Sequence, residues 1–176
     1  GPEALAAVNS AIESAEPAVQ DEAVRILSTW PNNWPEDDEA GQALLVLATS
    51  AEKMSHQVLG LRGYMQYVRG NKKLSSEQKV AKVKDVRSHI KRPEEQRQAI
   101  AVLGEAPSSS ALELLTTLAE NPAVVEEAYS AMVRIAAKKI PGVYKDKRRE
   151  VLQTVVDKSK NNRTKNRARR NRNGLR

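Results

Sequence analysis

Hydrophobic residues recur at intervals of three and four residues along most of the chain. From Pro2 onward, Leu5, Val8 and Ile12 share this spacing, which places side chains on one face of a helix. No segment alternates apolar and polar residues with the two-residue period of a half-buried strand. The pattern therefore predicts an all-α fold built from amphipathic helices.

Proline, glycine and serine mark where these helices begin and end. Pro17 and Pro93 precede apolar runs, and proline suits a first helical turn because the N–H groups there have no intrahelical acceptor. Gly70 ends another run, as glycine often does. Ser75 and Gln78 have the spacing of a capping box. The sequence predicts helices that begin near residues 2, 17, 36, 53, 75, 93, 108, 122, 144 and 161.

One apolar stripe of each helix is expected to face the core. In the helix that follows residue 75, this stripe extends as far as Ile90. Tyr64 and Tyr67 are three residues apart, as core-facing residues of a helix are. Other residues expected on inner stripes include Val24, Ile26, Leu27, Met54, Val83, Val86 and Tyr144.

Pairs of helices recur along the chain. Breaks open a new pair near Pro17, Met54, Pro93, Pro122 and Asn161, at intervals of 37, 39, 29 and 39 residues. Recurrence of this length is typical of a solenoid, in which neighbouring pairs bury each other's apolar faces. A helix bundle is the alternative, but ten short helices in regular pairs favour the solenoid.

Three parts of the sequence resemble HEAT repeats. The segment from Arg92 to Pro107 is similar to the inner helix of such a repeat. Residues 111–115, 121–124 and 127–135 resemble the repeat that follows, and residues 22–27 are a third match. In many HEAT turns an aspartate stands where the best match here has Asn121. The segments thus resemble a divergent HEAT-like array of the armadillo type.

This resemblance implies an architecture and a class of function. The architecture is a right-handed α-α superhelix of about five helix pairs, with residues 1–160 as the HEAT-like solenoid and 161–176 as a basic terminal helix or tail. The function implied is a non-catalytic scaffold that binds another protein or a neighbouring domain of the parent chain. Residues 61–65 and the Trp30–Pro31 turn resemble arrays of multidomain, often exported, bacterial proteins, which favours an extracytoplasmic location.

Charge adds a second hypothesis. The net charge of +7 divides into −8 over residues 1–60, +8 over 61–92, −5 over 93–137 and +12 over 138–176. Such asymmetry concerns partners and association rather than fold. The alternative function is therefore nucleic-acid or polyanion binding through basic patches at 72–92 and 158–176.

Each basic patch also has a simpler interpretation. For the first patch we favour an ordinary solvated helix face. Few aromatic residues interleave its charges, so stacking on single-stranded bases is poorly supported. The second is either a capping helix or a flexible arm, and we expect a helix from near Asn161 with a frayed end. Nucleic acid is the less favoured partner. The candidate contact residues are Lys72, Lys73, Lys79, Lys82, Lys84, Arg87, Lys91, Arg92, Arg163, Lys165, Arg167, Arg169, Arg170 and Arg172.

Residue patterns for catalysis or metal binding are missing. The chain has no cysteine, and neither His56 nor His89 has a histidine or cysteine at the four-residue spacing of a helical metal pair. We expect His56 to take a packing or surface role and His89 to lie on a solvated face. No enzyme, metal or cofactor is expected, and no apolar run approaches the ~18 residues of a membrane span, so membrane insertion is not expected.

Overall fold

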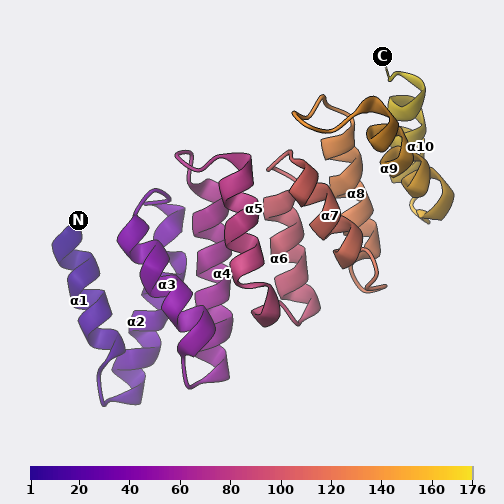
Figure 1. Cartoon of the computed structure of the whole chain (residues 1–176). Helices are drawn as coiled ribbons and strands as arrows, with labels where there is room; N and C mark the ends of the chain where they lie inside the picture. The colour runs from indigo at the N-terminus through magenta and orange to yellow at the C-terminus, as the bar shows by residue number, and fades with distance from the viewer. Residues whose placement is uncertain (176) are drawn as a thin grey trace. The chain divides into compact units, whose positions relative to one another are not determined.

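A computed structural model describes residues 1–175, which form a succession of helices joined by short turns (Figure 1). The described residues contain no strand beyond an isolated bridge between Ile140 and Val143, so the predicted all-α fold is confirmed. Residues 162–173 are helical, as expected for a helix that begins near Asn161. The elements are α1 (Pro2–Ile12), α2 (Pro17–Thr29), η1 (Trp30–Asn32), α3 (Asp38–Ser50), α4 (Met54–Gly70), α5 (Ser76–Asp85), η2 (Arg87–His89), α6 (Pro93–Leu103), α7 (Ser109–Leu118), α8 (Val125–Ala136), α9 (Lys145–Lys158) and α10 (Asn162–Asn173).

The helix boundaries follow the sequence signals. The predicted capping box at the start of α5 is confirmed, because the Ser75 N–H donates to Gln78 Oε1 at 2.9 Å and the Gln78 N–H donates to Ser75 Oγ at 3.2 Å. Ser108 Oγ accepts from the Ala111 N–H at 3.0 Å at the start of α7. These side chains satisfy N–H groups that have no acceptor within the helix.

The chain divides into two compact units. Unit 1 comprises Gly1–Leu74 and Lys82–Ile90, and unit 2 comprises Ser75–Ala81 and Lys91–Arg176, so α5 belongs to both. In unit 1, α1 packs on α2, and α4 packs on both α3 and α2. In unit 2, α6, α8 and α10 contact one another in succession, while α7 and α9 pack against them as a second layer (Figure 1).

Glycine allows the backbones of unit 1 to approach closely. A Cβ atom built on Gly60 of α4 would lie 2.6 Å from Leu47 Cβ and 2.7 Å from the Ala48 backbone nitrogen of α3. A Cβ atom on Gly63 would lie 2.8 Å from the Ser28 carbonyl oxygen of α2. Both positions therefore require glycine for helix packing.

The core of unit 1 includes polar groups that are paired. The Tyr67 hydroxyl donates to Asp38 Oδ1 at 2.7 Å, and the buried Asn71 donates to the same oxygen at 3.4 Å. Burial, and then the hydrogen bond to Asp38, raise the pKa of Tyr67 to about 12. Burial, with the nearby Asp85 carboxylate, raises the pKa of Tyr64 to about 12. Both tyrosines are buried, as predicted.

His56 is buried and joins α4 to α2. Its Nε2 lies 2.6 Å from Asp21 Oδ1, and Lys53 Nζ donates to the same oxygen at 3.3 Å. The hydrogen bonds from His56 and Lys53 lower the pKa of the Asp21 carboxyl group. The packing role expected of His56 is therefore confirmed, and the polar group that pairs with it comes from a helix 35 residues away in sequence.

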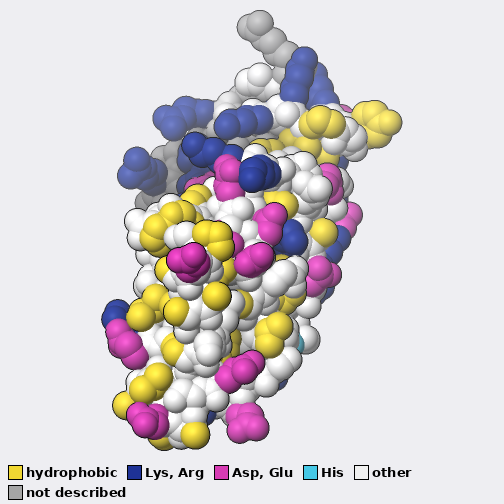
Figure 2. Space-filling view, turned by 90° about the vertical axis from the view of Figure 1, so that its left-hand side faces the viewer, with side chains coloured by type: hydrophobic (Ala, Val, Ile, Leu, Met, Phe, Trp, Pro, Cys, Tyr) yellow, Lys and Arg dark blue, Asp and Glu magenta, His cyan; other side chains and the backbone are white. Residues whose placement is uncertain are grey.

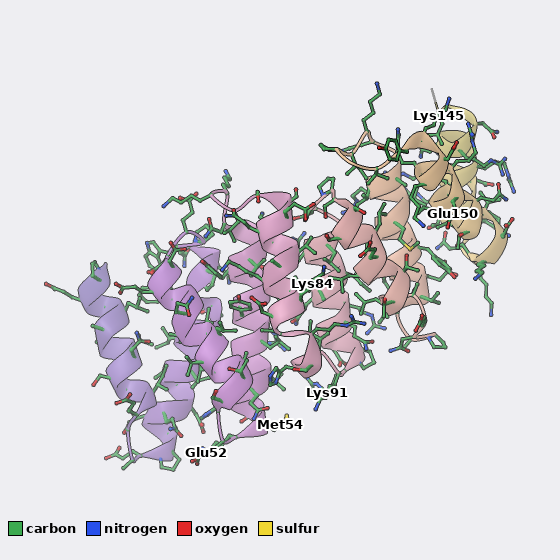
Figure 3. All side chains as sticks on the ribbon, in the orientation of Figure 1. Glu52, Met54, Lys84, Lys91, Lys145 and Glu150 are labelled. Atoms are coloured by element: carbon green, nitrogen blue, oxygen red, sulfur yellow. The ribbon has the colours of Figure 1, made fainter. Side chains whose placement is uncertain are left out.

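Some predicted core positions are wrong. Ile26 is 37% exposed, because it lies off the stripe that Val24 and Leu27 form three residues apart. Met54 is 69% exposed as the first residue of α4 (Figure 3), and Tyr144 is 84% exposed as the N-cap of α9. The helix expected to reach Ile90 ends at Asp85, where η2 follows after one residue.

Candidate functional site

Helix α10 forms although Ala168 is the one apolar residue within its bounds. Asn161 caps the helix by accepting from the Thr164 N–H at 3.1 Å. Ala168 is fully buried, with Thr164 and Asn171 half-buried on the same face, and this face packs on α8 and α9. Small and polar side chains therefore hold α10 in place, and long basic side chains cover the rest of its surface.

Six cations flank that buried face. Arg163, Arg167 and Arg170 follow one another at spacings of four and three residues, and so share one side of the helix. Lys165, Arg169 and Arg172 have the same spacing on the other side. Figure 2 shows Lys and Arg side chains gathered near the C-terminal end of the chain.

None of these six cations pairs with a carboxylate among the described residues. Arg172 donates instead to Gln153 Oε1 at 2.7 Å, and Arg169 donates to Asn166 Oδ1 at 3.1 Å. The neighbouring α9 differs, because Lys147 Nζ lies 3.1 Å from Glu150 Oε1. The α10 surface thus retains its positive charge. Arg176, the last residue of the predicted patch 158–176, lies outside the described residues.

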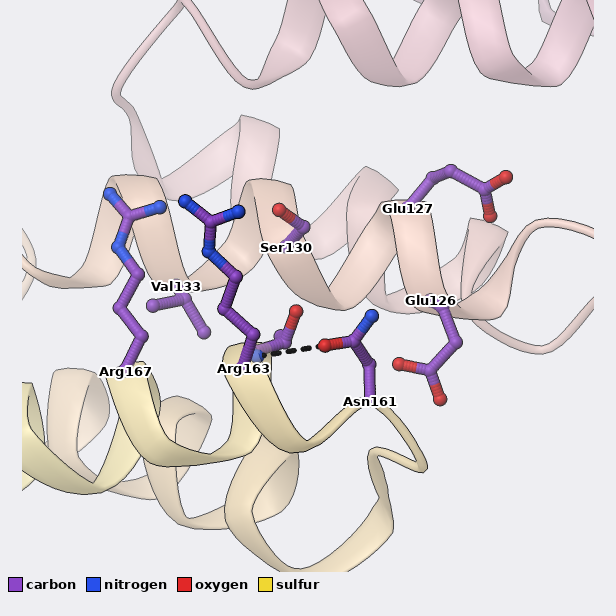
Figure 4. Close-up of a pocket in the computed structure, with 8 residues that line it drawn as sticks. Glu126, Glu127, Ser130, Val133, Asn161, Arg163 and Arg167 are labelled. Carbon is purple, nitrogen blue, oxygen red and sulfur yellow. Dashed lines mark hydrogen bonds between the residues drawn. The ribbon is translucent and has the colours of Figure 1, made fainter.

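A pocket of about 500 Å³ lies between α8 and α10, within unit 2 (Figure 4). Arg163 and Arg167 extend from α10 in the same direction, and Ser130 of α8 lines the same pocket (Figure 4). The lining residues are Glu126, Glu127, Ser130 and Val133 of α8, with Asn161, Arg163, Thr164 and Arg167.

The two glutamates of this pocket bind elsewhere in unit 2. Glu126 accepts from Ser159 Oγ at 2.6 Å and from the Lys160 N–H at 2.7 Å, which fixes the turn between α9 and α10. Glu127 Oε1 accepts from Arg97 Nε of α6 at 3.1 Å. Glu126 therefore helps to position α10, Glu127 pairs with α6, and neither forms an ion pair with an α10 arginine among the described residues. Their role was not predicted, because each contact joins residues 30 or more positions apart.

The first basic patch is divided between the two units. Lys72, Lys73, Lys82, Lys84 and Arg87 belong to unit 1, whereas Lys79, Lys91 and Arg92 belong to unit 2.

Lys73 and Arg92 of the first patch form ion pairs. Lys73 Nζ lies 3.4 Å from Glu36 Oε2, and Arg92 Nε lies 2.9 Å from Glu95 Oε1. Burial raises the pKa of Glu95, but hydrogen bonds from the Lys91 N–H and from Arg92 outweigh it and leave that pKa lowered. Glu95 therefore acts as an ionised acceptor at the start of α6.

Unit 1 carries an apolar groove between α1 and α2. Its volume is about 470 Å³, and its walls are mostly alanine and valine side chains together with Ile26. Val19 is 41% exposed there. Figure 2 shows hydrophobic side chains interspersed with acidic ones on this face of unit 1. The groove was not predicted, since Ile26 was expected in the core.

The described residues contain no group of three or more His, Asp or Glu side chains that could hold a metal ion. None of their helices combines the length and apolar character needed to cross a bilayer. Comparisons with protein-family models, with curated proteins and with solved structures found no match. The resemblance to HEAT repeats therefore stays a prediction.

Proposed function

We propose that this chain is a non-catalytic helical-repeat scaffold that binds another protein or a neighbouring domain of its parent chain. The observation that carries the proposal is the two-layer stacking in unit 2, where α6, α8 and α10 contact in succession. Stacking of this kind lets short helix pairs bury apolar faces that a single pair leaves exposed. The finer architecture that we propose is a HEAT-like, right-handed superhelix of about five pairs.

Helix α10 is the surface that we assign to the partner. Its six cations lack ion pairs among the described residues. The helix contributes only one fully buried residue, Ala168, to the core of unit 2. Unpaired surface charge of one sign speeds association with a surface of the opposite sign and fixes its orientation. The partner surface is therefore acidic.

Charge-dependent capture tests this function. The tagged chain and a variant with Arg163, Arg167, Arg169 and Arg170 replaced by alanine are cross-linked in the source cell. Alanine favours helix, so α10 persists in the variant, which circular dichroism checks. A matched control removes four exposed lysines of unit 2 outside α10: Lys138, Lys139, Lys145 and Lys158. The proposal is supported if proteins that the unmodified chain captures are lost with the α10 variant and kept with the control. It is contradicted if both variants capture these proteins equally.

Polyanion binding is the second candidate function, and the unpaired cations of α10 favour it as well. Nucleic-acid binding through these side chains is independent of sequence and weakens steeply with salt, because each neutralised phosphate releases counterions. Six phosphate contacts give a slope of about −5 in log K against log salt concentration. Fluorescence anisotropy with a labelled duplex measures this slope, and no binding at about 50 mM salt eliminates the candidate.

A further inference from the structure

We propose that the pocket between α8 and α10 binds a phosphate monoester on a phosphorylated segment of the partner protein. The inference rests on the proposed scaffold function and names the chemical group that the scaffold recognises. It concerns the end of the pocket that Arg163, Arg167 and Ser130 form.

The donors at this end of the pocket suit a tetrahedral anion. Arg163 and Arg167 are four residues apart on a helix, so their side chains are neighbours, and both extend from α10 in one direction (Figure 4). A guanidinium group offers two parallel N–H donors to phosphate oxygens. The Ser130 hydroxyl adds a donor from α8. Two guanidinium charges match the −1.5 to −2 charge, roughly, of a phosphate monoester.

These donors are not committed within the described residues. Neither guanidinium forms an ion pair there, whereas both pocket glutamates are held by Arg97, Ser159 and Lys160. A ligand phosphate therefore displaces no carboxylate when it binds the arginines. The pocket, at about 500 Å³, is large enough to hold part of the ligand chain as well.

The glutamates favour a peptide over a nucleic acid as the source of the phosphate. Glu126 and Glu127 line the same pocket as the arginines. A nucleic-acid strand carries a negative charge at every nucleotide, and a second phosphate near these carboxylates is repelled. A phosphorylated peptide instead presents backbone N–H groups next to its phosphate, and the Oε2 oxygen of Glu127, which Arg97 does not engage, can accept from such a group.

The test uses the full chain and a pentapeptide with phosphoserine between alanines, which carries fluorescein on its N-terminus and an amide at its C-terminus. Anisotropy compares it with the unphosphorylated peptide and with an unlabelled 12-nucleotide single strand as competitor. The first variant is R163A/R167A. The matched control is K165A/R169A, which removes the same charge from α10 but no side chain that lines the pocket.

The phosphorylated peptide is expected to bind at least about tenfold more tightly than the unphosphorylated one, because charge-assisted hydrogen bonds are lost with the phosphate. R163A/R167A is expected to weaken binding about tenfold or more, and K165A/R169A less than about threefold. Three results would each overturn the inference. The first is an equal loss of affinity in the two variants, and the second is equal binding of the two peptides. The third is stronger competition by the single strand than by unlabelled phosphopeptide.

The pocket inference and the scaffold function can fail independently of each other. If the phosphopeptide does not bind while cross-linked partners still depend on the α10 charges, the pocket inference is overturned and the scaffold function stands. If the phosphopeptide binds through Arg163 and Arg167 but no captured protein depends on α10, the pocket binds phosphate and the scaffold function fails.

Discussion

Helices α4 and α10 are held in place by different means. Helix α4 approaches α3 and α2 so closely at Gly60 and Gly63 that no larger residue fits without a shift. Helix α10 buries only Ala168 fully and relies on the Asn161 cap and on the turn that Glu126 fixes. Packing therefore buries eight of the seventeen residues of α4, whereas on α10 it leaves most side chains free to carry charge. The candidate contact surface lies where packing demands least.

The largest effect is expected at Gly60. Replacement by alanine places Cβ within 2.7 Å of the Ala48 backbone nitrogen, and overpacking of this kind lowers the free energy of unfolding by about 1–3 kcal/mol. Both tryptophans, Trp30 and Trp34, lie in unit 1, so urea unfolding followed by tryptophan fluorescence reports on this unit. Gly174→Ala is the control, since its Cβ meets nothing closer than 3.4 Å. A G60A variant as stable as the wild type contradicts the close packing.

Alkaline pH is expected to weaken unit 1 next. The pKa values of Tyr64 and Tyr67 rise to about 12 from 10.0. A raised pKa in the folded state means that the stabilisation is complete below pH 10 and is lost as pH rises toward 12. Urea midpoints between pH 9 and 12 measure this loss, and Tyr67→Phe is expected to lessen it. A midpoint that stays constant to pH 12 refutes the buried tyrosine environment.

A smaller effect is expected at the start of α10. Asn161→Ala removes the acceptor of the Thr164 N–H, and loss of such a cap costs about 1 kcal/mol. Hydrogen exchange of the α10 amides is expected to speed up, while tryptophan-monitored unfolding of unit 1 stays unchanged. Asn166→Ala is the matched control on the same helix, because its side chain bonds only to Arg169. Equal exchange in the two variants means that the cap does not hold α10.

The smallest effect on stability is expected from the α10 charges themselves. K165A/R169A removes two cations that form no ion pair among the described residues, so the free energy of unfolding is expected to change by less than about 0.5 kcal/mol. The salt dependence of stability is expected to decrease as like charges are removed. A thermal unfolding series from about 20 to 500 mM salt measures both. A loss above about 1 kcal/mol means that these side chains support the fold.

Local signals in the sequence were enough to predict the helices. The Ser75–Gln78 capping box and the prolines that open α2 and α6 depend on neighbours within one or two turns. The three-residue spacing of Tyr64 and Tyr67 was enough to predict that both are buried. The same local reasoning wrongly placed Ile26 in the core. Ile26 lines the open groove between α1 and α2, and local spacing carries no information on how these two helices pack.

Whether a charged side chain forms an ion pair depends on contacts between residues that are distant in the sequence, so the sequence could not predict the pairing. Lys73 pairs with Glu36, and Glu127 pairs with Arg97 rather than with α10. Counting charge did not show which cations of the first patch form ion pairs, as Lys73 and Arg92 do. The pocket that includes Arg163 and Arg167 arises from the packing of α8 on α10.

The central claim is that the cations of α10 contact a partner and are not needed for folding. Quantitative cross-linking in the source cell tests it most directly, with the variant that lacks Arg163, Arg167, Arg169 and Arg170 beside the control that lacks Lys138, Lys139, Lys145 and Lys158. We predict that both variants fold and that only the α10 variant loses the captured proteins. Capture of the same proteins in equal amounts by both variants contradicts the account.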